Sequence, residues 1–118
     1  MMLRMALAVL VALLASAPAP SLAMQVMESL PAAHAVMDET QTEFFIRFDG
    51  PVDHAASRLE IVRDGKPLQT LHPRLNSQPN VIYSGVRRLA PGAYVLRWTT
   101  RSMRDQEAAM GEIDFTVR

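Results

Sequence analysis

The side chains of this 118-residue chain that could do chemistry are metal ligands rather than nucleophiles. Histidine occurs three times, at His34, His54 and His72. No two of them have the spacing of a local metal-binding motif, although His54 follows Asp53 and forms an adjacent carboxylate–imidazole pair with it. Each histidine by itself fits a solvated loop position. A metal site here would therefore draw its ligands from several segments.

Methionine thioethers form a second set of candidate ligands. Met24, Met27 and Met37 lie in the first third of the chain, and Met103 and Met110 lie close to its end. Soft thioethers suit Cu(I), and these would converge if the two parts of the chain met at one end of the fold. The alternative is that Met27, Met37 and Met110 fill gaps at the ends of the core, a common role of methionine.

Acidic residues near the C-terminus complete the candidate groups, and no enzyme signature accompanies them. Asp105, Glu107 and Glu112 are close in sequence and fit a solvated rim. The chain has no Cys, and neither Ser57 nor Ser84 lies in a G-x-S-x-G elbow. It also lacks an H-E-x-x-H motif and a glycine-rich phosphate loop. The sequence therefore predicts a protein that is not an enzyme.

Charge and cysteine content narrow the function classes further. Lys plus Arg and Asp plus Glu each number 12, so the formal net charge is zero. This balance predicts no nucleic-acid partner and no polybasic membrane patch. Without disulfides, a small exported domain must gain its stability from sheet packing, from a metal or from a partner.

The N-terminal segment has the pattern of a cleaved signal peptide over residues 1–23. Arg4 provides the positive start, residues 5–14 are nearly all apolar, and small residues at Ser21 and Ala23 precede the expected cleavage. The apolar run is too short to span a bilayer comfortably. A retained N-terminal anchor is the alternative. With Met24 as the first mature residue, residues 24–118 form one small domain with one core.

The stretch from Leu89 to Trp98 is the clearest guide to the fold. Pro91 and Gly92 predict a turn, and Tyr94, Leu96 and Trp98 then share one face of a strand. A tyrosine just after a turn, entering such a strand, resembles the corner of a Greek-key sandwich.

Alternating patterns and turn residues predict the remaining elements. Asp64 and Gly65 indicate a hairpin, residues 54–57 a helical turn, and residues 32–41 and 101–110 loops. We expect about seven short strands and an immunoglobulin-like Greek-key β-sandwich. The segments with strand character are 25–30, 43–48, 59–63, 67–71, 81–86, 93–100 and 112–117.

Five segments, read in order, resemble the periplasmic copper-resistance CopC family. They are the early S-x-P-A at residues 29–32, the apolar residues 35–37, an F-x-x-P-V at 48–52, L-x-P-G-x-Y-x-V-x-W-like residues 89–98, and the closing G-x-x-x-F-x-V at 111–117. Their order and spacing extend over the whole predicted mature chain. They are turn and core residues, so they are specific for the fold rather than for copper.

The resemblance implies a Cu(II) site made of the mature N-terminal His and a D-x-H motif before the last strand. Here the N-terminal position falls at Ala23 or Met24, and the D-x-H position, counted back from Gly111, has Asp105 but Glu107 in place of His. The spacing from Trp98 to Gly111 is one residue longer here than in the family. Counted forward from Trp98, the D-x-H position therefore falls at residues 104–106, where Arg104 and Gln106 take the places of Asp and His. Residues 58–80 contain no Met, so the methionine-rich Cu(I) segment of some relatives is missing.

From this resemblance we predict a periplasmic copper-binding protein that accepts and passes on copper, in an oxidation state left open. The predicted metal ligands are Met24, His34, Asp105 and Glu107. A periplasmic or inner-membrane copper-handling protein is the expected partner. The alternative function is a domain that keeps the fold, has lost the metal and serves as a periplasmic protein-interaction module.

Overall fold

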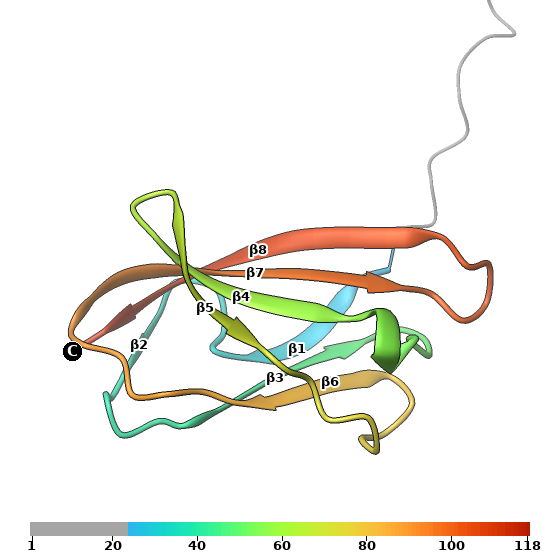
Figure 1. The fold of residues 1–118 in the computed structure, drawn as a ribbon, viewed down its shortest axis with the longest axis horizontal. Helices are drawn as coiled ribbons and strands as arrows, with labels where there is room; N and C mark the ends of the chain where they lie inside the picture. The colour runs from blue at the N-terminus through green and yellow to red at the C-terminus, as the bar shows by residue number, and fades with distance from the viewer. Residues whose placement is uncertain (1–23) are drawn as a thin grey trace, which may run out of the picture.

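The computed structural model describes residues 24–118, which form two packed β-sheets (Figure 1). The predicted signal peptide lies outside the described residues. The first sheet has the order β1-β3-β6, and the second has the order β2-β8-β7-β4-β5. All pairs are antiparallel except β2 with β8. The strands are β1 Val26–Leu30, β2 Ala35–Met37, β3 Glu43–Phe48, β4 Arg58–Arg63, β5 Lys66–Leu71, β6 Val81–Gly85, β7 Gly92–Arg101 and β8 Ala108–Val117.

The core lies between the sheets and follows the alternation of the strand sequences. On β7 the buried apolar side chains are Tyr94, Leu96 and Trp98, as predicted, and the buried Thr100 continues the same face. The rings of Phe48 on β3 and Trp98 meet edge to face with centroids 5.0 Å apart, which joins the two sheets. Burial of alternate residues on both sheets confirms the predicted all-β sandwich, with eight strands where about seven were expected.

The turn before β7 forms the predicted corner. Tyr94 Oη donates a hydrogen bond to the Ala90 carbonyl at 2.6 Å, which ties the strand to the turn that precedes it. Arg63 covers the other side of this tyrosine: its guanidinium lies 5.2 Å from the ring centroid and donates to Oη at 3.2 Å. Gly92 takes a φ of 152°, which suits a residue without Cβ.

Two further predicted turns are confirmed, the β4–β5 hairpin and the helical turn after Asp53. Asp64 and Gly65 both have positive φ, 51° and 78°, as the predicted β4–β5 hairpin requires. The predicted helical turn is a 3₁₀ helix, η2 His54–Ala56, whose first amides are capped by the Asp53 carboxylate. No helix within residues 24–118 is long and apolar enough to cross a membrane.

Two predicted loops contain strand residues. The segment 32–41 includes β2, and residues 108–110 of the predicted C-terminal loop belong to β8. β2 has only three residues and forms because it pairs in parallel with Phe115 to Val117 of β8, far away in sequence. Ala108 to Met110 pair with Arg101 to Thr99 of β7. Neither pairing leaves a local pattern, so the sequence did not reveal them.

Candidate metal site

The first described residues lie at the same end of the sandwich as the β7–β8 loop, residues 102–107 (Figure 1). Met24 is half-buried and packs against the core. Gln25 and Asp49 then exchange two hydrogen bonds: the Gln25 amide donates to Asp49 Oδ1 and the Asp49 amide donates to the Gln25 carbonyl, both at 3.1 Å. The β3–β4 connection thus fixes the N-terminal residues.

The same connection holds the β7–β8 loop. The Met103 amide donates to the Pro51 carbonyl at 3.0 Å, and Arg104 Nη2 donates to the Asp49 carbonyl at 3.3 Å. Asp49 therefore contacts both the residue after Met24 and the residue before Asp105. Sequence reasoning missed this role of Asp49, whose only signal was its place in the motif at 48–52.

Inside the loop, hydrogen bonds fix the acidic residues in place. Asp105 Oδ1 accepts the Glu107 amide at 3.0 Å, and Gln106 between them has a φ of 63°. The buried Ser102 closes the loop, with its amide donating to the Glu107 carbonyl at 2.9 Å. Asp105 and Glu107 are both exposed, so their carboxylate oxygens can reach an ion from solvent.

Two arginines of the same region would repel a cation that approaches the loop. Arg104 lies over Gly50 so closely that a Cβ there would be 2.8 Å from the guanidinium carbon. Arg101 Nη1 reaches the Gln106 carbonyl at 3.5 Å. Arg101, the last residue of β7, and Arg104 together balance the two negative charges of Asp105 and Glu107, so residues 101–107 carry no net charge that would attract a metal ion.

His34 does not join this group. Its amide donates to the Asp114 carbonyl at 2.7 Å, and its neighbour Ala35 pairs with Phe115. Because β8 starts at Ala108, beside the loop, and advances about 3.3 Å per residue, His34 lies roughly 23 Å from the loop along the strand. It instead lines a separate pocket that includes Asp64. The structure therefore places the segment of Met24 at the same end of the sandwich as Asp105 and Glu107, and His34 elsewhere.

The other histidines and the methionines also have defined surroundings. His54 Nε2 lies within hydrogen-bond distance of two carbonyls, 2.8 Å from that of Val81 and 3.1 Å from that of Gln78. Met37 is buried, as core packing predicts. Met27 and Met110 are 56% and 74% exposed, so the core-packing interpretation is wrong for these two.

The groups with shifted pKa values lie outside the loop. Hydrogen bonds from the amide and hydroxyl of Thr40 lower the pKa of Asp38. A hydrogen bond with Glu43 raises the pKa of Tyr83. Within residues 24–118, no three His, Asp or Glu side chains converge as a metal-binding group. The candidate site consists of one N-terminal residue and two carboxylates, with thioethers nearby.

Comparisons with known proteins agree with this architecture. The family model described as CopC domain matches residues 26–118. CopC from Methylosinus trichosporium OB3b has a TM-score of 0.71 and 24% identity, covering 80% of this chain and 92% of its own. PcoC, a methionine-rich copper resistance protein from Escherichia coli, has a TM-score of 0.69 and 17% identity, covering 81% of this chain and 99% of its own. At these identities, the likeness shows a shared fold. No curated protein sequence matches the chain.

Proposed function

The chain belongs to the CopC domain family, and we propose that it is an exported, periplasmic copper-resistance protein that binds copper and passes it to a partner without turnover. The observation that carries this proposal is the meeting of the N-terminal residues with the β7–β8 loop through Asp49. This is the place where the family resemblance puts the copper chelate. The known copper resistance protein of similar fold supports the same assignment.

The donor set fits copper with modest affinity. If the signal peptide is cleaved after Ala23, the site has the Met24 amine and the carboxylates of Asp105 and Glu107, a nitrogen and oxygen set that Cu(II) accepts. The thioethers of Met24 and the half-exposed Met103 suit Cu(I). Each missing imidazole costs about 3 kcal/mol, or roughly two orders of magnitude in Kd. Such a site would yield its ion readily to a better ligand.

A Cu(II) titration of residues 24–118 against a competing chelator tests the proposal, with a repeat using Cu(I) under reducing conditions. We expect stoichiometric binding that Asp105→Ala/Glu107→Ala weakens at least tenfold. Glu112→Ala is the matched control, because this carboxylate is also exposed but lies on β8, outside the loop, and pairs with Arg97 of β7. His34→Ala separates the distant histidine from the site.

An interaction module without metal is the second candidate function. The positive charges of Arg101 at the end of β7 and of Arg104 in the loop favour it, as does the absence of histidine from the ligand positions. No binding of either copper ion by the parent protein would remove the first function and direct the search to a protein partner. Binding that the double variant leaves unchanged would remove the proposed ligands, and a loss with His34→Ala alone would move the site to the His34 pocket.

A further inference from the structure

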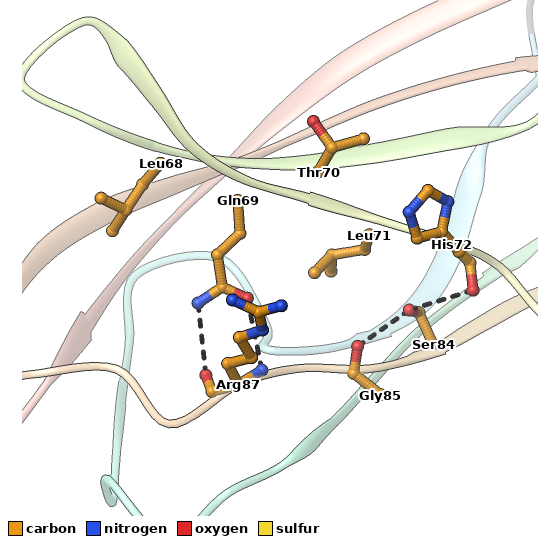
Figure 2. Close-up of a pocket in the computed structure, with 8 residues that line it drawn as sticks. All are labelled: Leu68, Gln69, Thr70, Leu71, His72, Ser84, Gly85 and Arg87. Carbon is orange, nitrogen blue, oxygen red and sulfur yellow. Dashed lines mark hydrogen bonds between the residues drawn. The ribbon is translucent and has the colours of Figure 1, made fainter.

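Two strand edges face each other on one side of the sandwich without a strand between them. β5 ends the five-stranded sheet and β6 ends the three-stranded sheet. A cleft of about 430 Å³ between these edges, which we call the lateral window, is lined by residues 68–72, Ser84, Gly85 and Arg87 (Figure 2). Unpaired strand edges carry main-chain donors and acceptors that another chain can bind. The lateral window thus has the framework of a strand-addition site.

Along the β6 edge, side chains and loops replace the missing strand. Alternate residues of a strand direct their main-chain groups to the same side. On the outer side, the Val81 carbonyl contacts His54 Nε2, the Tyr83 carbonyl accepts the Arg74 amide at 2.8 Å, and Arg87 follows in the same phase. The carbonyls of Val81 and Tyr83 therefore already have partners within the protein and are not available to another chain.

At Arg87, the side-chain amide of Gln69 takes the hydrogen-bonding place of a neighbouring strand. The Arg87 amide donates to Gln69 Oε1 at 3.3 Å, and Gln69 Nε2 donates to the Arg87 carbonyl at 3.4 Å (Figure 2). The Gln69 amide thus makes both bonds that an antiparallel partner residue would make. Both distances exceed the usual range for such bonds, so an incoming main chain can displace this amide at little cost.

Between Arg87 and the closed end, both edges offer main-chain groups. Ser84 Oγ lies 3.4 Å from the His72 carbonyl, which shows that His72 directs its carbonyl across the gap. Thr70 is in phase with His72, and Gly85 is in phase with Arg87, so both direct main-chain groups into the lateral window. The Gly85 carbonyl already accepts a hydrogen bond from Ser84 Oγ at 2.9 Å, and its second lone pair remains for an incoming amide (Figure 2). The window extends about 10 Å, enough for about three residues of extended chain.

The side chains around the lateral window select the chemistry of the occupant. Arg87 forms no salt bridge with any residue of 24–118, and no carboxylate lines the window, whereas His72 adds a second basic group. Leu68 is 53% exposed and Leu71 is buried beneath, so apolar surface is also available. An extended segment with a carboxylate flanked by apolar residues matches both features.

We propose that the lateral window binds an extended acidic segment of a partner protein, which adds as a strand between β5 and β6. Its main chain replaces the Gln69 amide at Arg87, and its carboxylate pairs with the Arg87 guanidinium. This interaction surface is independent of copper, since the window contains none of the ligands of the proposed metal site.

Selection from a phage-displayed pool of random nine-residue peptides on the full-length protein tests the proposal. We expect enriched peptides that combine Asp or Glu with β-branched residues. Arg87→Glu should weaken these peptides at least tenfold and enrich Lys- or Arg-containing peptides instead. Arg88→Glu is the matched control, because this neighbouring arginine is exposed, pairs with Glu39 and does not line the window. Gln69→Ala should tighten binding, because it removes the competing amide.

Amide NMR shifts then locate the bound peptide, with Thr70, Gly85 and Arg87 as the expected positions. An Arg87→Glu protein that unfolds at the same midpoint temperature as the wild type shows that its loss of peptide binding does not come from a loss of folding. Three results would overturn the proposal: no enrichment by the wild-type protein, the same acidic peptides enriched on Arg87→Glu, or shifts confined to residues outside the lateral window.

Discussion

Replacing Gly111 by Ala should displace Trp98 and overpack the core where Trp98 meets Phe48. A Cβ at Gly111 would lie 2.6 Å from Trp98 Cζ2, 2.7 Å from Cε2 and 2.8 Å from Nε1. Since carbon atoms pack at about 3.5 Å or more, the indole must retreat by about 1 Å. It would then press on Phe48, which is fully buried. Overpacking of this kind costs about 1–3 kcal/mol of unfolding free energy.

Urea unfolding followed by far-UV circular dichroism measures this cost, and two other glycines serve as controls. Gly85 has only the Thr42 carbonyl at 3.9 Å, so Gly85→Ala should be neutral or stabilise the strand by about 0.5 kcal/mol. Gly65 has open space but a φ of 78°, so Gly65→Ala should cost about 1 kcal/mol through backbone strain alone. The three substitutions separate lack of space from backbone conformation.

A double-mutant cycle with Trp98→Phe identifies the clash itself. The smaller ring lacks the indole atoms nearest Gly111, so Gly111→Ala should cost much less in the Trp98→Phe protein than in the wild type. A Gly111→Ala protein as stable as the wild type would refute the reasoning. An equal cost in both backgrounds would show that something other than the indole fills the space above Gly111.

Two further predictions concern the corner and the acid response. Tyr94→Phe removes the bonds to Ala90 and Arg63 and should lower the unfolding free energy by about 1 kcal/mol in urea. The control Tyr83→Phe loses only a hydrogen bond with the exposed Glu43 and should change it by less than about 0.5 kcal/mol; equal losses would contradict the corner. The pKa of Asp38 is lowered in the fold by Thr40, so its contribution is present above pH 3.8 and lost as the pH falls through the lower folded value. Asp38→Asn should therefore flatten the decline of stability below pH 3.8 in acid titrations followed by circular dichroism, and an unchanged slope would count against this contribution.

Much of the fold could be predicted because local rules govern it. The alternation at Tyr94, Leu96 and Trp98 placed these side chains in the core, since successive strand residues point to opposite faces. The backbone angles at Asp64 and Gly65 follow from turn chemistry, and the 3₁₀ turn falls within the helical turn predicted at residues 54–57. Each of these signals involves neighbours in sequence.

The candidate site was predicted only in part, because its ligands are distant in sequence. Position in the family motifs indicated Met24 and Asp105, but only the contacts of Asp49 and Arg104 show that their segments share one end. The sequence also could not show that His34 lies far from them, because its position depends on the parallel pairing of β2 with β8.

The sequence by itself therefore determined the strand faces, the turns and the sandwich class of this protein. The tertiary structure decided which loops meet, why a side chain at Gly111 would meet Trp98, and where two strand edges leave the lateral window. The division has a physical cause. Backbone torsion and side-chain alternation are set within a few residues, whereas sheet order and loop contacts depend on residues that only the folded chain brings together.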